Sequence, residues 1–429
     1  MKSVSILGWY LLSFFVVSLF LIRGPVRAIS GSSDLRGPYA AACAWRDGSN
    51  PYDSTQLKDA FIRREGSARP VQFLHPPGVI IPMLPFTWLD WQKTKVTFAL
   101  LNTAAIGLLY WGLITMNPRP NRKHYNRWIL LLVGLYAPIH TGIQLGQLSV
   151  SAIAFGVAGI AVITRHRSIL AGFLIGLSFT LKPQIGLVMV VYLGFTGRWK
   201  ALAMTILVCL IPLIVSSWGL SAAGYSFSDV RASWQQSLSE TNSVKGGERF
   251  TSSNKARANL LNLHVFLHGF IKDLRLVSIA APSIVLALCL VWWCLYLSRW
   301  QDCPEAVCVS IPLILSLLII YHRTYDAILL LVPLSWAMAG GKAIPKLSSV
   351  TVVSSTLAFV VPGGAVISWL QTRGRLPESV LSSPLWEKLV VPHGSLMLVV
   401  CAFGLFVAMF HSPTHKSITA SEKRDCAQS

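Results

Sequence analysis

The sequence predicts an all-α integral membrane protein, a polytopic bundle of about 11–13 transmembrane helices with short interfacial helices in its first external loop. Hydrophobic residues make up 53% of the chain and charged residues only 13%, whereas soluble proteins carry about 25% charged residues. The mean hydropathy is +0.56. The apolar residues also fall in long runs, and backbone polar groups in lipid must be satisfied within their own segment, so these runs are read as helices.

The first apolar run covers residues 5–22 and contains no charge, which is long enough to cross a hydrocarbon core. It exceeds the apolar stretch of about 7–15 residues found in signal peptides, and no clean small-residue cleavage site follows it. We therefore expect a retained anchor. Further runs lie at residues 75–90, 95–116, 128–164, 168–195, 201–218, 276–297, 306–321, 325–340, 347–370 and 393–410.

The predicted organisation is a single polytopic membrane domain over residues 1–411. Two polar stretches are too long for ordinary connections between helices, and long loops with their own structure are usually functional. They are a first external loop at residues 24–74 and a second long loop at residues 221–275. Residues 412–429 are polar, which predicts a disordered tail.

The net charge of +20 arises from 37 Lys and Arg against 17 Asp and Glu. Basic residues cluster in short loops at residues 119–127, 165–167 and 198–200, which is typical of cytoplasmic loops beside anionic lipid. This explains the charge without nucleic acid as a partner.

If every run crossed the membrane once, however, the loop at 119–127 would lie on the same side of the membrane as the first loop. A re-entrant segment at 75–90 is one solution.

The first loop is predicted to contain two short helices. For the second, Asp53 and Gln56 have the spacing of a capping box, and Gly66 is placed to end the helix. Its apolar face consists of Leu57, Ala60 and Phe61. Such a helix is expected to lie in the membrane interface.

Asp34 follows the first helix by about a dozen residues. Its carboxylate suits the N-cap of a helix over residues 35–46, with Pro38 early in that helix. Held at a membrane surface, the same carboxylate can act as a general base on a sugar hydroxyl. The residues alone leave both interpretations open.

Ionisable residues within apolar runs are functional candidates, because they are costly at membrane depth. Lys182 precedes Pro183 in the middle of the run at 168–195, where the helix is expected to break. One interpretation is a lysine that extends to the interface. The other is a cation in a polar cavity that binds phosphate.

His322, Arg323 and Asp326 interrupt two apolar runs. They form either a tight loop with an Arg–Asp pair or a group of donors for phosphate.

His75 opens the run at 75–90, and the amides of Gln144 and Gln147 lie in another apolar stretch, where they can bond to neighbouring helices. His264 and His268 have the spacing of metal ligands without an acidic partner between them, so we predict no metal and no cofactor.

Short motifs follow one another in a fixed order along residues 30–335. They are Asp34-Leu35, Tyr39-Ala-Ala-Ala42, Gly48-Ser-Asn-Pro-Tyr52, His75-Pro-Pro77, Leu145-Gly-Gln-Leu-Ser149, Ala171-Gly-Phe-Leu-Ile-Gly-Leu177, Leu181-Lys-Pro-Gln184, Arg198-Trp199, and His322 with Tyr325. This ordered set resembles glycosyltransferase family 87, the polytopic GT-C-type enzymes that include polyprenyl-phosphate-mannose-dependent α-mannosyltransferases. The chain departs from the family at Ser149, where an Asn is frequent, and it matches only loosely around residues 240–244.

The resemblance implies an inverting transfer of a hexose, with mannose as the expected sugar, from a polyprenyl-phosphate sugar to a glycolipid or glycan acceptor. It implies an active site on the extracytoplasmic side of the plasma membrane, without a bound metal, and it assigns Asp34 as the general base. The leaving phosphate needs cationic or hydrogen-bond donors, and Lys182, His322 and Arg323 are the candidates. The expected substrate-binding residues are His75, Gln147, Tyr325 and Tyr52.

The main alternative is a polytopic transporter or a flippase for lipid-linked glycans. Such a protein would also bury Lys, His and Gln among its helices, but it would show matching broken segments in two halves. This sequence shows one broken segment and a long loop that carries an acid.

Overall fold

The computed structural model describes residues 6–66, 71–117, 122–244, 250–251, 254, 257–299, 303–340 and 344–411. Across these residues the chain is helical, without a strand, and an isolated antiparallel bridge joins Leu260 to Arg323. The all-α prediction is confirmed. The tail at 412–429 lies outside the described residues.

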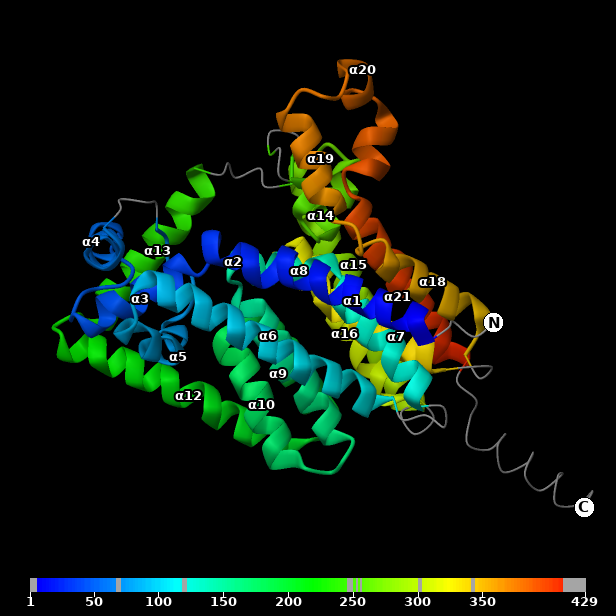
Figure 1. The fold of residues 1–429 in the computed structure, drawn as a ribbon, viewed down its shortest axis with the longest axis horizontal. Helices are drawn as coiled ribbons and strands as arrows, with labels where there is room; N and C mark the ends of the chain where they lie inside the picture. The colour runs from blue at the N-terminus through cyan, green and yellow to red at the C-terminus, as the bar shows by residue number, and fades with distance from the viewer. Residues whose placement is uncertain are drawn as a thin grey trace, which may run out of the picture. The chain divides into compact units, whose positions relative to one another are not determined.

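The chain divides into two compact units, which are described separately. Unit 1 comprises Met1–Leu113 and Arg127–Arg249, and unit 2 comprises Ile114–Asn126 and Phe250–Ser429. The helices α6 (Trp91–Met116) and α7 (Arg122–Leu135) have residues in both. The remaining elements of unit 1 are α1 (Ile6–Leu21), η1 (Ile22–Val26), α2 (Arg27–Ser30), α3 (Arg36–Arg46), α4 (Ser54–Glu65), η2 (Pro77–Val79), α5 (Ile80–Met83), η3 (Leu84–Trp88), α8 (Ala137–Leu145), α9 (Leu148–Ile163), α10 (Ser168–Leu181), α11 (Pro183–Phe195), α12 (Trp199–Ala222) and α13 (Phe227–Val244) (Figure 1).

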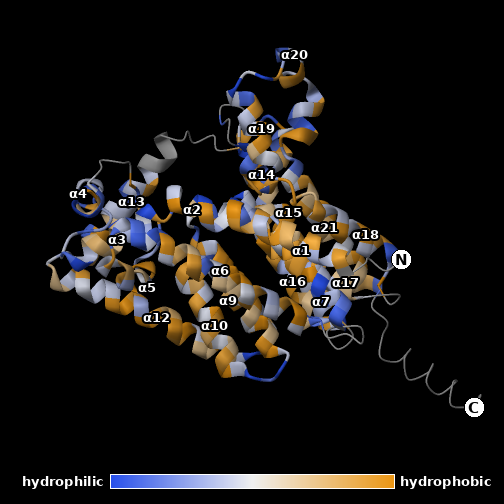
Figure 2. Cartoon of the chain, in the orientation of Figure 1, coloured by the Kyte–Doolittle hydropathy of each residue, from blue (hydrophilic) through white to orange (hydrophobic). Residues whose placement is uncertain are grey.

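Five helical segments are long and apolar enough to cross a membrane: Leu7–Ser30, Trp91–Met116, Trp199–Ala222, Leu274–Arg299 and His393–His411. The pair Lys123–Leu135 and Ala137–Leu145, bent by 48°, would make a sixth. Figure 2 shows the apolar character of α6 and α12 against the hydrophilic α4. The chain is therefore a polytopic helical membrane protein.

Several of the predicted apolar runs form two or more short helices instead of one long helix. Within the run at 128–164, one helix ends shortly before Pro138 and the next ends at Gly146. Within the run at 168–195, the helix breaks at Lys182. These positions explain the shorter apolar helices, because proline lacks the N–H of a continuing helix and the left-handed φ of +68° at Gly146 ends one.

Small residues allow the helices α9, α10 and α12 of unit 1 to pack closely. A Cβ atom at Gly172 of α10 would lie 2.2 Å from the carbonyl oxygen of Ala201 in α12. On the other side of α10, a Cβ at Gly159 of α9 would lie 2.6 Å from Cγ1 of Ile175. Close backbone approach through small residues is typical of helices packed within membranes.

The two helices predicted in the first loop are α3 and α4. Asp53 caps α4 by accepting hydrogen bonds from the backbone N–H of Thr55 and Gln56, both at 2.9 Å, and Gly66 ends it at φ +73°. Gln56 does not complete the capping box, since its Oε1 accepts from the N–H of Asn50 at 2.8 Å. The helix α3 differs from an interfacial helix, because residues 37–44 are all buried.

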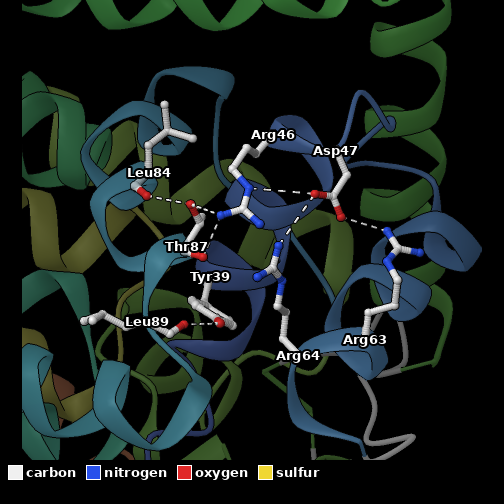
Figure 3. A network of polar contacts seen from close by, with 8 residues as sticks. All are labelled: Tyr39, Arg46, Asp47, Arg63, Arg64, Leu84, Thr87 and Leu89. Carbon is white, nitrogen blue, oxygen red and sulfur yellow. Dashed lines mark hydrogen bonds and ion pairs between the residues drawn. The ribbon is translucent and has the colours of Figure 1, made fainter.

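Ion pairs around Asp47 join the C-terminal ends of α3 and α4. Its carboxylate lies 2.9 Å from Arg63 and 3.8 Å from both Arg64 and Arg46, and Figure 3 shows it between these guanidinium groups. Arg46 also donates to the carbonyl oxygen of Thr87 at 2.7 Å. The first loop is thus a packed scaffold, linked to the segment that follows it.

The segment at 75–90 returns to the first loop at both of its ends. Tyr52 donates its hydroxyl to the carbonyl oxygen of His75 at 2.8 Å, and Tyr39 donates to that of Leu89 at 2.9 Å. Between these two points the chain forms only the short elements η2, α5 and η3. This geometry fits the re-entrant solution to the charge conflict, since a segment that crossed the bilayer would end about 30 Å from its start.

The helix α12 links the first loop to a basic loop. Near its C-terminal end, a Cβ at Gly219 would lie 2.2 Å from the ring of Trp45, in the last turn of α3. Trp45 donates to the carbonyl oxygen of Ser216 at 2.9 Å. The helix begins directly after Arg198 and is 24 residues long. At 1.5 Å per residue such a helix is about 36 Å long, enough to cross a bilayer.

Unit 2 is built around α16 (Glu305–Ile319), in which residues 306–311 and 313–318 are all buried. Its neighbours include α15 (Leu274–Arg299), α17 (Leu331–Ala339) and α21 (His393–His411). A partly buried ion pair joins Arg257 to Glu387. The other elements are η4 (Arg257–Asn259), α14 (Leu263–His268), η5 (Thr324–Leu330), α18 (Lys346–Leu357), α19 (Gly363–Thr372), α20 (Glu378–Leu381) and η7 (Trp386–Val390).

Candidate active site

The backbone around Asp34 is fixed against the end of α8. The N–H of Ser32 donates to the carbonyl oxygen of Gln144 at 2.9 Å, and the N–H of Asp34 donates to that of Leu145 at 3.0 Å. Gly146 follows with φ +68°, and a Cβ there would lie 2.8 Å from Cβ of Leu35. Glycine is required at this position both for the left-handed conformation and for the close approach.

The carboxylate of Asp34 does not cap α3. The N-cap residue of α3 is Leu35, without a side-chain capping bond. Asp34 instead accepts hydrogen bonds from Nε2 of Gln147 through Oδ2 and from the hydroxyl of Ser33 through Oδ1, the latter at 2.9 Å. Both donors are neutral, and no cation pairs with this carboxylate among the described residues. The oxygen atoms of a carboxylate accept hydrogen bonds, so these two donors fix the orientation of the Asp34 side chain.

Gln147 is the N-cap residue of α9, so its side chain is placed by the turn at Gly146. Its carbonyl oxygen accepts from Nδ2 of Asn102 at 3.3 Å, and Oδ1 of Asn102 accepts from the hydroxyl of Ser151 at 2.8 Å. Asn102 is fully buried in α6. Sequence reasoning missed Asn102, although an amide inside an apolar run is the same signal that identified Gln147.

Lys182 lies at the predicted break, between α10 and α11. A Cβ at Gly186 would lie 2.3 Å from Cα of Phe179, so the two helices pack tightly beside the break. Lys182 is 4% exposed, and its Nζ donates to the hydroxyl of Ser149. It does not extend to a protein surface. The contacts of Asp34 and Lys182 thus fall on residues two apart at the start of α9.

His75 lies in the segment before η2, outside the membrane-spanning helices. Burial, and to a smaller extent the nearby Lys182 cation, lower the pKa of His75 to about 4. Its imidazole is therefore neutral near pH 7 and can donate or accept a hydrogen bond without carrying charge. The ring lies 5.8 Å from that of Phe73.

Tyr52 supports this segment from within the first loop. Its ring is 5.2 Å from Phe73 and 5.9 Å from Trp234 of α13, and its hydroxyl bonds to the carbonyl oxygen of His75. Five of the predicted residues in unit 1 are therefore linked, by direct contacts and through the start of α9. They are Asp34, Tyr52, His75, Gln147 and Lys182.

His322, Arg323 and Tyr325 belong to unit 2, in the connection from α16 to η5. Nδ1 of His322 lies 2.9 Å from Oδ2 of Asp326, and both side chains are buried. Arg323 donates from Nε to the hydroxyl of Tyr321 at 3.1 Å, and Tyr325 is 8% exposed. The pairing of Asp326 with His322 was not predicted, although the i,i+4 spacing was visible in the sequence.

No group of three or more His, Cys, Asp or Glu side chains is arranged for a metal ion within the part of the chain that the structure describes. His264 and His268 instead flank the ring of Phe250, at centroid distances of 5.5 Å and 5.8 Å. Aromatic packing accounts for the spacing of these two histidines.

The model of glycosyltransferase family 87 matches residues 73–320, more than half of the 429 residues. The matched range includes His75, Gln147 and Lys182, while Asp34 precedes it and His322 follows it. No curated protein and no solved structure matches the chain. The match favours the transferase interpretation over the transporter. The chain belongs to glycosyltransferase family 87 and is a membrane glycosyltransferase.

Proposed function

We propose that this protein transfers a hexose, with mannose as the expected sugar, from a polyprenyl-phosphate donor to a hydroxyl of a glycolipid or glycan acceptor, with inversion at the anomeric carbon. The observation that carries the proposal is the arrangement at the start of α9. There Gln147 holds the carboxylate of Asp34, and Ser149 holds the buried Lys182 cation. A base and an anion-binding group are the two functions that this transfer needs.

Asp34 is the general base in this mechanism. As the acceptor hydroxyl attacks the anomeric carbon, its proton passes to the Asp34 carboxylate, and the bond between that carbon and the phosphate oxygen breaks. Inversion follows, because attack and departure occur on opposite faces of the sugar. The neutral hydrogen bonds from Gln147 and Ser33 orient the carboxylate without neutralising it.

In unit 1, Lys182 recognises the donor phosphate. For His322 and Arg323 of unit 2, phosphate recognition is proposed from the sequence. Negative charge on the phosphate increases when the sugar leaves, so cations and N–H donors stabilise the transition state more than the ground state. Polyprenyl phosphate is already a good leaving group, so the mechanism has neither a paired acid nor a metal or other cofactor.

Four further residues contribute to substrate binding. Gln147 orients the base, and His75 offers a neutral imidazole to a sugar hydroxyl. Tyr52 acts through the segment that carries His75, to which its hydroxyl is bonded. Tyr325, adjacent to the phosphate-binding group in the sequence, is the fourth.

The location that we propose is the plasma membrane, with the active site on its extracytoplasmic side. The support is that α12 places residues 198–200 at the opposite end of a membrane-length helix from the first loop. Because basic loops remain cytoplasmic, the first loop with Asp34 would then face outwards.

The test is a transfer assay with the full-length protein in lipid nanodiscs and membrane glycolipids as acceptors. Labelled polyprenyl-phosphate mannose and polyprenyl-phosphate glucose are compared with the nucleotide sugars. We expect transfer from a polyprenyl-phosphate hexose to give the opposite anomeric configuration. Transfer from a nucleotide sugar, or retention of configuration, would contradict the proposal.

A further inference from the structure

A buried pair of side chains in unit 2 contains an atom without a partner. Nδ1 of His322 lies 2.9 Å from Oδ2 of Asp326, and the side chains are 0% and 1% exposed. Nε2 of the same ring is also buried and has no hydrogen-bond partner among the described residues. An unsatisfied buried polar atom costs about 1–3 kcal/mol and is rare in native proteins. Together with the Asp326 carboxylate at the other ring nitrogen, it is a candidate position for a ligand atom.

Hydrogen bonds hold both the backbone and the ring of His322. The carbonyl oxygen of His322 accepts from the N–H of Leu261 at 3.0 Å, next to the bridge between Leu260 and Arg323. Asp326 lies in the first turn of η5 and holds Nδ1. The hydrogen bond at one ring nitrogen determines what the other nitrogen can do. With Nδ1–H donated to the carboxylate, Nε2 is the atom left for a ligand.

We propose that Asp326 is a positioning residue that orients the ring of His322, so that Nε2–H donates to a phosphate oxygen of the lipid-phosphate substrate. This inference rests on the proposed function. A carboxylate at Nδ1 fixes the orientation of an imidazole ring. When the bond between the anomeric carbon and the phosphate oxygen breaks, the electron pair remains on the phosphate, and the Nε2–H bond stabilises that charge. The ring neither gains nor loses a proton in this step.

The experiment measures binding of polyprenyl phosphate and of the uncharged polyprenol to the full-length protein in nanodiscs, with wild type, His322→Gln, Asp326→Asn and the double variant. A hydrogen bond to a charged group contributes about 1.5–3 kcal/mol, so we expect each single substitution to weaken binding of polyprenyl phosphate at least about tenfold. Polyprenol binding should not change. The double variant should bind no more weakly than His322→Gln, because Asp326 acts through His322.

The matched control is His140→Gln. His140 is also buried, and one of its ring nitrogens has no partner among the described residues. Its other nitrogen lies 2.7 Å from the carbonyl oxygen of Gly134 rather than from a carboxylate. Its substitution should leave polyprenyl phosphate binding unchanged. Asp326→Glu retains the carboxylate and serves as a second variant if Asp326→Asn does not fold. We expect Asp326→Glu to retain more of the preference for phosphate than His322→Gln.

Equal losses for polyprenol and polyprenyl phosphate would overturn the inference, as would fully additive losses in the double variant. Unchanged phosphate affinity in Asp326→Asn would do the same, even with a slower turnover. The proposed function fails separately, if the wild type binds polyprenyl phosphate selectively but transfers no sugar from it.

Discussion

The side-chain amide of Gln147 donates a hydrogen bond to the carboxylate of Asp34, although 113 residues separate them in the chain. The bond joins the segment after the first membrane helix to the N-cap of α9. Because Leu35 rather than Asp34 is the N-cap of α3, the contact excludes the capping interpretation of Asp34. The carboxylate is oriented by the neutral donors Gln147 and Ser33.

The first prediction concerns Gln147. Gln147→Ala removes a hydrogen bond to a charged group, which contributes about 1.5–3 kcal/mol, so turnover should fall about ten- to a hundredfold. Gln144→Ala is the matched control, because the Gln144 side chain makes no hydrogen bond to the described residues, although its backbone oxygen holds Ser32. Steady-state transfer rates measure both variants. Equal effects would mean that the end of α8 matters only for folding.

The second prediction concerns Lys182. Lys182→Met keeps most of the length and removes the charge, so the KM for the lipid donor should rise at least about tenfold, while expression and thermal stability hold. The exposed Lys200 provides the control substitution Lys200→Met. If Lys182→Met unfolds the protein while the surviving fraction binds donor normally, the lysine has a structural role.

The third prediction concerns topology. In intact cells, a membrane-impermeant maleimide should label Lys58→Cys, on the exposed face of α4, but not Lys200→Cys at the start of α12. Permeabilisation should expose the second site, because a membrane-length helix separates it from the first loop. The reverse pattern would place the Asp34 side of unit 1 in the cytoplasm.

The fourth prediction concerns pH and His75. Burial lowers the pKa of His75 to about 4 in the folded protein, below the value of about 6.5 in an unfolded chain. As the pH falls from 6.5 towards 4, the unfolded state therefore binds the proton first, and stability is lost. At pH 5 the loss is about 2 kcal/mol relative to pH 7.

Thermal unfolding of the wild type and of His75→Gln at pH 7 and pH 5 measures this loss. The variant should lose less stability on acidification, whereas His166→Asn, at an exposed histidine, should behave like the wild type. An identical acid response of wild type and His75→Gln would show that His75 does not contribute.

Much of the fold could be predicted from the sequence, because the patterns that indicate helices, caps and breaks are local. The apolar runs, the cap at Asp53 and the break at Lys182-Pro183 each depend on neighbouring residues, and the structure confirms them. The buried state of α3 was not predictable, because its short run of alanines is equally compatible with an interfacial helix until α4 and η3 cover it. The contacts from Asp34 to Gln147 and from Lys182 to Ser149 join distant segments, and no local pattern specifies them.

The role of Asp34 is tested most directly by the turnover of Asp34→Asn with a polyprenyl-phosphate sugar and its acceptor. Asn retains the shape and the hydrogen bond with Gln147 but removes the base, and general-base catalysis contributes about 10²–10⁴-fold in rate. We expect a folded protein that binds the lipid donor and turns over at least about a hundred times more slowly. Asp53→Asn, the same change at the cap of α4, should be nearly silent, since Asn caps about as well as Asp. Near-normal turnover of Asp34→Asn would contradict the assignment of the base.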